Sequence, residues 1–138
     1  MTTISIERKD LQPYETVTGT VSWDLDDQPR DLELRLCWFS RDDGMQESKT
    51  IRSLKLDDVT RGERTFSFEL PSEPWSMRGQ LITLVWGIEL VAKAVGGLAL
   101  EEFIVGPDRK VVELPELPEA TLDSRLRRFK KRLDQQRR

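Results

Sequence analysis

The sequence contains no histidine and only one cysteine, Cys37, in 138 residues. Without a second cysteine the chain cannot form an internal disulfide, and without histidine it cannot assemble a Ser-His-Asp or Cys-His catalytic arrangement. A zinc site built from cysteine and histidine needs about four such ligands and is excluded for the same reason. The sequence therefore predicts a protein that is not an enzyme, with no catalytic residues, no cofactor and no metal.

Long hydrophobic runs are also scarce. The most apolar segment, residues 81–100, carries Glu89 and Lys93 near its centre. Each of these charges costs about 2.5–3.5 kcal/mol in a bilayer, and Gly96-Gly97 predicts a turn, so the segment does not fit a membrane span. The first ten residues, MTTISIERKD, have no apolar stretch of the kind that signal peptides carry. Together with the missing disulfide, this predicts a cytoplasmic location.

Charge is abundant but divided between two parts of the chain. Charged residues make up 34% of the sequence and hydrophobic residues 37%, which is enough for one domain with a modest core. Residues 1–119 hold 14 basic and 23 acidic side chains, whereas residues 120–138 hold 8 basic and 2 acidic ones. Pro115 and Pro118 favour an extended connector. We therefore expect a domain over 1–114, a linker over 115–119 and a basic segment over 120–138.

Ahead of the prolines, hydrophobic residues recur at every second position, as in strands with one buried face. The alternation is clearest at 16–23, 32–39, 65–70 and 82–90 and weaker at 2–7, 47–56, 98–105 and 110–114. Turn-forming residues cluster between them, at 26–29, 42–44, 61–62, 71–74, 96–97 and 106–108. Seven or eight such strands predict an all-β fold, an antiparallel immunoglobulin-like sandwich, because one-sided strands need a second sheet to bury them.

The periodicity changes after Thr121. Leu122, Leu126, Phe129 and Leu133 are spaced 4, 3 and 4 residues apart, which places them in one stripe along a helix. Thr121 can cap the amino end. The sequence thus predicts a C-terminal amphipathic helix about 27 Å long. An isolated helix of this length is marginal in water, so the stripe needs a surface to lie on.

Two segments carry motifs that go beyond alternation. Residues 69–92, ELPSEPWSMRGQLITLVWGIELVA, contain a strand ending in Leu-Pro, a Pro-x-Ser turn, a Gly and a long strand with a central Trp, and in this they resemble the arrestin-like fold family. Residues 11–21, LQPYETVTGTV, are similar to its early Pro-Gly-Glu-x-Val-x-Gly-x-Val, with Tyr14 at the first glycine position. The matching positions are Pro13, Glu15, Gly19, Leu70, Pro71, Pro74, Trp75, Ser76, Gly79 and Trp86.

The resemblance covers residues 2–114, the length of a single arrestin-type sandwich, and suggests a bacterial or sporulation-control-like relative. It implies a non-catalytic adaptor or scaffold that binds proteins, often by strand addition at a sheet edge. The residues also have an independent physical interpretation, in which Pro71 ends a strand, Gly79 provides a turn with positive φ and Trp86 anchors the core.

Adjacent acid pairs occur at 26–27, 42–43, 57–58 and 101–102. Carboxylates in sandwich loops can converge on calcium, and Asp24, Asp26 and Asp27 form the densest group, or two can act together in glycoside hydrolysis. Acidic turns more often serve solubility, so a calcium-binding or hydrolytic sandwich is kept as the second alternative. Cys37, in a predicted strand and without a histidine to activate it, is expected to be inert packing.

The basic helix leaves three possibilities open. It can dock on its own sandwich or on a second copy as a homodimer, lie on an anionic membrane surface, or engage a separate protein, since the acidic body disfavours nucleic acid. We favour an adaptor that binds protein partners through a sheet edge and this helix, with a peripheral membrane protein as the alternative. The helix residues expected to contact a partner are Leu122, Arg125, Leu126, Arg128, Phe129, Lys130, Arg132 and Leu133.

Overall fold

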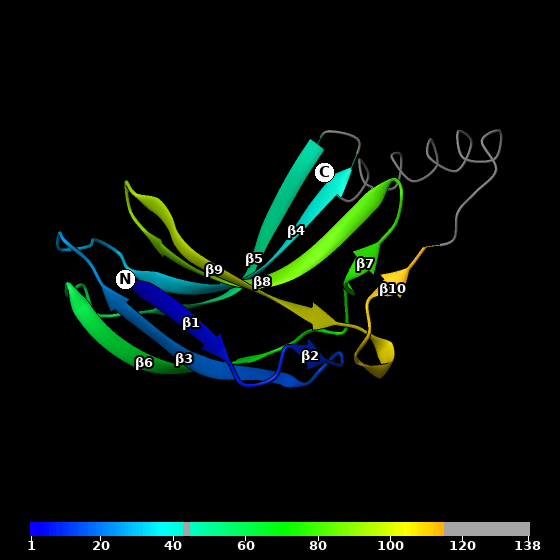
Figure 1. Ribbon diagram of the computed structural model, residues 1–138, viewed down its shortest axis with the longest axis horizontal. Helices are drawn as coiled ribbons and strands as arrows, with labels where there is room; N and C mark the ends of the chain where they lie inside the picture. Colours follow the sequence, from blue (N-terminus) through cyan, green and yellow to red (C-terminus); the bar gives the residue numbers. More distant parts are fainter. Residues whose placement is uncertain (43–44, 115–138) are drawn as a thin grey trace.

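A computed structural model describes residues 1–42 and 45–114, and within them the chain forms ten strands and one short 3-10 helix arranged as two sheets (Figure 1). The predicted linker and C-terminal helix lie outside the described residues. The elements are β1 (Thr2–Ile6), β2 (Asp10–Leu11), β3 (Thr16–Asp24), β4 (Glu33–Asp42), β5 (Met45–Lys55), β6 (Arg61–Glu69), β7 (Met77–Arg78), β8 (Ile82–Ala92), β9 (Gly96–Val105), η1 (Pro107–Arg109) and β10 (Val112–Glu113).

The smaller sheet has the order β1-β3-β6 and is antiparallel throughout. The larger sheet has the order β10-β7-β8-β4-β5, and β9 and β2 extend it beside β8. β7 and β9 follow one another along the same side of β8, since β7 pairs with Thr83 and Leu84 and β9 pairs with the stretch from Trp86 to Ala92. β5 and β6 are therefore edge strands of the described part of the chain.

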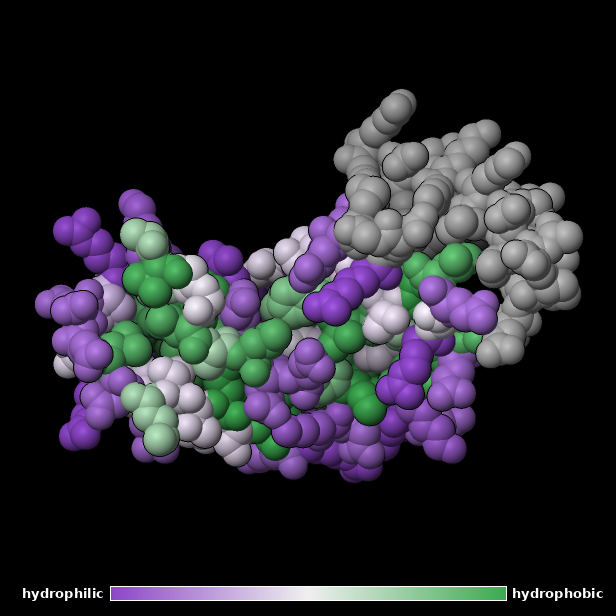
Figure 2. Space-filling model, turned by 45° about the horizontal axis from the view of Figure 1, so that its top comes forward, coloured by the Kyte–Doolittle hydropathy of each residue, from purple (hydrophilic) through white to green (hydrophobic). Residues whose placement is uncertain are grey.

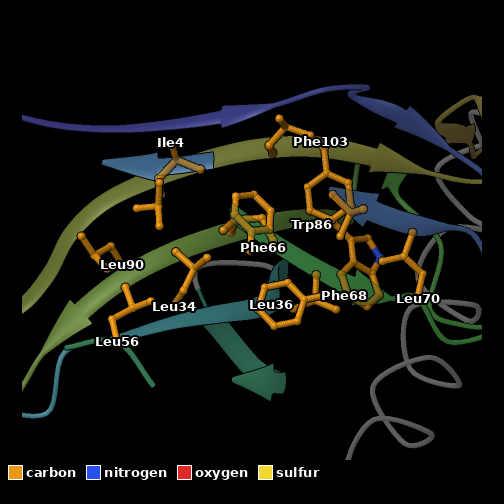
Figure 3. Close-up of a cluster of buried hydrophobic side chains, with 14 of the residues drawn as sticks. Ile4, Leu34, Leu36, Leu56, Phe66, Phe68, Leu70, Trp86, Leu90 and Phe103 are labelled. Carbon is orange, nitrogen blue, oxygen red and sulfur yellow. The ribbon is translucent and has the colours of Figure 1, made fainter. Parts of the chain in front are cut away.

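The core lies between the two sheets, and the predicted alternation places it correctly. Inner-facing residues of β4 and β8 are fully buried at Leu34, Leu36, Trp86, Ile88 and Leu90. Phe66 and Phe68 of β6 point toward them from the smaller sheet (Figure 3). Each buried side chain of this size contributes about 1.5–3 kcal/mol through the hydrophobic effect. The all-β, two-sheet architecture is thus as the sequence predicts.

One predicted turn is wrong. Arg61 and Gly62 were expected to form a turn, but they begin β6, and Gly62 pairs with Trp23. A Cβ at Gly62 would lie 2.4 Å from the Trp23 ring, so this glycine provides room for a core indole. The chain instead turns at residues 57–60, where the Trp23 indole N–H donates to the Val59 carbonyl at 2.9 Å.

Three further boundaries differ from the sequence-based expectation. The turn predicted at Gly96-Gly97 occupies residues 93–95, and Gly96, with φ of 83°, already begins β9. The strand predicted over 110–114 is shortened to β10. β2 and β7, each two residues long, were not predicted, because two residues carry no periodicity.

The larger sheet reaches beyond the smaller one. The ends of β4, β5 and β8 near residues 38–49 and 82–84 extend upward and away from β1, β3 and β6 (Figure 1). The surface in Figure 2 is hydrophilic along much of its rim, with hydrophobic residues showing along the middle of the visible face. We call the projecting part of the larger sheet its distal half.

Candidate functional site

The longest edge of the larger sheet is β5, an 11-residue strand that pairs with β4 alone among the described residues. The Leu56 N–H donates to the Leu32 carbonyl at 2.9 Å, so even-numbered residues of β4 direct their backbone groups toward β5. By this alternation, and allowing for the bulge opposite Leu36 and Cys37, some residues of β5 direct their N–H and C=O groups away from the sheet. These free-edge residues are Gln46, Ser48, Thr50, Ser53 and Lys55.

The side chains at this edge are short and polar. Gln46, Ser48, Thr50 and Ser53 are exposed, and Lys55 supplies the one charge among the five. Natural edge strands are commonly protected by several charged side chains, by proline or by extreme shortness. Among its free-edge residues β5 has a single lysine, and its only other protection is the bulge, so in the described part of the chain its edge is open to pairing.

The neighbouring edge, β6, is better protected. Its free-edge residues include Arg61, Glu63 and Glu69, because the Leu70 N–H donates to the Glu15 carbonyl and sets the alternation. One end is also occupied, since Arg52 Nε donates to the Glu69 carbonyl at 3.0 Å. Arg52 thereby bridges the two sheets on the side where both edges lie.

The early motif forms a braced turn in front of β3. The Glu15 carboxylate accepts the Gln12 N–H at 2.7 Å and pairs with Arg109 of η1. These two donors hold the pKa of Glu15 below its ordinary value of 4.5. Tyr14, which stands at the family's first glycine position, has φ of 71°, so the left-handed turn is retained by a residue that adopts it at a cost.

The crossover from β6 to β8 is fixed by three hydrogen bonds. The Trp86 indole N–H donates to the Pro74 carbonyl at 2.9 Å, beside a cis peptide bond between Glu73 and Pro74. The buried Ser76 hydroxyl accepts the Val105 N–H at 2.9 Å, and the Ser76 N–H donates to the Val105 carbonyl at 2.7 Å. Ser76 is therefore a structural link to the end of β9.

Other motif residues of the crossover have structural roles. Leu70 is buried, and Trp75, which is 40% exposed, donates its indole N–H to the Ser72 carbonyl. Gly79 does not have the positive φ that was expected. It is instead covered by Leu114, whose Cδ1 would lie 2.9 Å from a Cβ at this position. The expectation of a left-handed turn at Gly79 is wrong because the glycine serves packing.

The residues on the inner face of the distal half lie at the border of the core cluster or outside it. Trp38 and Met77 are half-buried at the border of the core cluster, and Ile82 is 5% exposed but lies outside it. Trp23, Trp75 and Trp86 each donate the indole N–H to a backbone carbonyl.

Two polar groups on that face have no hydrogen-bond partner among the residues that the structure describes. The Trp38 indole N–H makes no hydrogen bond within the described residues. Ser40, which is 7% exposed, makes none through its hydroxyl there either. Among the described residues, the buried Ser40 hydroxyl is therefore without the hydrogen-bond partner that buried hydroxyls usually have.

Cys37 lies on the outer face of β4, as the alternation predicts, and is 3% exposed. Burial, with a smaller contribution from the negative charge of Glu89, raises the pKa of the Cys37 thiol to about 12. Its Sγ lies 3.5 Å from the Gly87 carbonyl oxygen. The thiol therefore stays protonated at neutral pH, which is consistent with packing.

The acid pairs are dispersed. Asp58 accepts the N–H groups of Leu32 at 2.9 Å and Asp31 at 3.3 Å, and so closes the loop before β4. Asp24 pairs with Arg61 at 3.0 Å. In residues 1–42 and 45–114, no three Cys, Asp or Glu side chains gather in a group that could hold a metal ion.

The helix residues proposed as a binding surface, Leu122 to Leu133, lie outside the described part of the chain, and the predictions made for them stay predictions. Among the residues that are described, no helix has the length and hydrophobicity needed to cross a membrane. The β5 edge could not have been identified from the sequence, because hydrophobic alternation shows which face a strand buries and not which strand ends a sheet.

The arrangement of the strands is that of an arrestin-type β-sandwich. Among solved structures, the sporulation control protein Spo0M from Bacillus subtilis is similar, with a TM-score of 0.53 and 18% sequence identity over 77% of this chain. The chain corresponds to 49% of the Spo0M chain, about half its length. No protein-family model and no curated protein sequence matches. The resemblance deduced from the two motifs is therefore confirmed as a likeness of fold.

Proposed function

We propose that this protein is a non-catalytic adaptor that binds an extended segment of a partner protein by strand addition along β5. The observation that carries the proposal is the open edge of β5, with five residues whose backbone groups point away from the sheet. In this binding mode, main-chain hydrogen bonds provide affinity and alternating side chains provide specificity. The Spo0M-like fold is compatible with such a role but does not determine it.

Charge suggests the kind of segment that would pair with this edge. Of the charged side chains described along β5, Lys49, Arg52 and Lys55 are basic and Glu47 is acidic. Lys49 and Lys55 lie on opposite faces of the strand, beside the two faces of an added strand. A partner segment with acidic side chains would be favoured by complementary charge.

The bulge limits the length of the pairing. It separates the free-edge residues into a distal group at 46–50 and a proximal group at 53–55. A regular added strand would follow the distal group, where three alternating residues face outward, and would need a kink of its own to continue. We therefore expect a short segment of about five residues as the minimal ligand.

Proline substitution tests the edge without disturbing the sheet. Ser48→Pro removes a free-edge N–H of β5, and Ser67→Pro removes the equivalent group of β6, so the two variants are matched in chemistry and exposure. Each protein would carry a photo-crosslinking residue at Thr50, in the distal group, and be used to capture partners from the native host. We expect capture by the wild type and by Ser67→Pro, and its loss in Ser48→Pro. Equal capture by all three proteins would refute binding at β5.

A further inference from the structure

The distal inner face of the larger sheet consists of the inward side chains at the projecting ends of its strands. Trp38 pairs with Trp86 of the core, Ser40 pairs with Leu84, and Met77 of β7 also lies opposite Leu84. Residues opposite one another in neighbouring strands share a face, so these side chains continue the core face outward. The face is defined by Trp38, Ser40, Glu47, Lys49, Met77 and Ile82, where Glu47 and Lys49 of β5 lie opposite Ser40 and Trp38.

This face has the composition of a docking surface. Trp38, Met77 and Ile82 are apolar, whereas the buried Ser40 hydroxyl and the Trp38 indole N–H have no hydrogen-bond partner in the described chain. The smaller sheet does not extend this far (Figure 1). A surface of this kind is completed by an element that brings both apolar side chains and polar groups.

We propose that residues 121–138 of the same chain dock on the distal inner face. The described chain ends next to it, because β10 pairs with β7 and the Leu114 N–H donates to the Arg78 carbonyl at 2.9 Å. Five further residues, 115–119, can span up to about 16 Å, which is enough to bring Thr121 over the outer strands of the sheet.

The dimensions of the helix and the sheet agree. From Leu122 to Leu133 the predicted apolar stripe is about 17 Å long. The five strands from β10 to β5 are about 19 Å across at a spacing of about 4.8 Å. A helix that begins near β7 and crosses β8 and β4 would place Phe129 near Trp38 and the stripe's last leucine near β5.

The distribution of charge also favours docking of residues 121–138 on the distal inner face. Residues 1–119 carry a net charge of −9 and residues 120–138 a net charge of +6. The linker keeps this segment at a high effective concentration next to the face, which favours it over a second copy. Lysine and arginine side chains are hydrogen-bond donors, which is the kind of group that the Ser40 oxygen can accept from. The proposal does not depend on the function proposed for β5.

Fluorine NMR of the full chain labelled with 5-fluorotryptophan tests the docking, because each of the four tryptophans gives one signal and Trp38→Phe identifies that of Trp38. Phe129→Asp places a charge in the stripe, whereas Gln135→Asp makes the same change of charge on the opposite side of the predicted helix. We expect Phe129→Asp to shift the Trp38 signal at least fivefold more than Gln135→Asp does, with Trp23 unchanged as evidence of an intact fold. Equal Trp38 signals in wild type and both variants would overturn the proposal.

A second measurement covers the case in which Phe129→Asp fails to fold. In a Cys37→Ala background, Ser40→Cys with Phe129→Cys should form an intramolecular disulfide in a glutathione redox buffer, and Ser40→Cys with Gln135→Cys should not. Light scattering should give a monomer of 16.1 kDa. A disulfide-linked dimer, or a wild-type dimer that Phe129→Asp dissociates, would show docking on a second copy and overturn the assignment to the same chain.

Discussion

Gly19→Ala should destabilise the sandwich strongly, because this glycine lets β1 approach β3. A Cβ at Gly19 would lie 2.0 Å from the Ser5 carbonyl oxygen and 2.8 Å from the Phe66 ring, and real Cβ atoms do not come closer than 3.0 Å. Strand β1 would have to retreat by about 1 Å, at an overpacking cost of about 1–3 kcal/mol with about 1 kcal/mol more for a weakened ladder hydrogen bond. We therefore expect the free energy of unfolding to fall by about 3 kcal/mol.

Thermal and urea denaturation measure this change. At about 4 °C per kcal/mol for a domain of this size, the melting temperature should fall by about 12 °C. Gly97→Ala is the matched control, because the added methyl group would meet only the movable Glu89 carboxylate, at 3.2 Å. That variant should lie within about 0.5 kcal/mol of wild type or be slightly more stable. A Gly19→Ala protein that melts within about 3 °C of wild type would refute the close approach of the two strands.

Three further predictions follow from the described contacts. Asp58→Ala should lower the free energy of unfolding by about 2 kcal/mol, since two backbone N–H groups lose their acceptor, whereas Asp57→Ala should change it by less than about 0.5 kcal/mol in urea denaturation. The folded pKa of Glu15 is lowered, so its stabilising effect is present above pH 4.5 and lost as the pH falls through the folded value. Glu15→Gln should therefore be less stable than wild type at pH 7, with the gap closing toward pH 3 in urea titrations. Cys37, with its pKa near 12, should react with Ellman's reagent in urea but only slowly in native buffer at pH 8.

Each of these predictions has an outcome that contradicts it. Equal stability of the two aspartate variants would mean that the loop before β4 does not depend on the Asp58 carboxylate. A stability gap for Glu15→Gln that stays constant from pH 7 to pH 3 would show that the charge of Glu15 is not what stabilises the turn. Fast labelling of native Cys37 would show that the outer face of β4 opens readily.

The sequence predicts the strands well where one face is buried, because the side-chain period of a strand is independent of its partners. Alternation identifies the hydrophobic inner residues of β4 and β8, and those in the centre of the sheet are fully buried, but it does not identify Ser40 on the same face of β4. The turn predicted at Arg61-Gly62 is wrong because glycine is typical of turns, whereas here Gly62 makes room for the ring of Trp23. Trp23 lies in a strand 39 residues earlier in the sequence. Contacts of this kind depend on pairing that local sequence does not encode.

The sequence predicted what type of site to expect, a sheet edge, but not which strand forms it. A sheet edge was expected from the arrestin-like resemblance, but assigning it to β5 required the strand order. The motif residues that carry the resemblance proved to be structural, since Glu15, Ser76 and Trp86 all hold backbone segments in place. The family resemblance therefore indicated the scaffold, whereas the surfaces that differ among such scaffolds had to come from the structure.

The two proposals concern the same strands but can be separated by experiment. Ser48 contributes a backbone group at the edge of β5, while Trp38 contributes a side chain to the inner face of β4. Ser48→Pro should therefore abolish partner capture and leave the Trp38 fluorine signal in place. Phe129→Asp should move that signal without removing any backbone donor of the edge. If Phe129→Asp also changed the amount of partner captured, the docked segment would be controlling access to β5, because the proposed path of the helix ends at that strand.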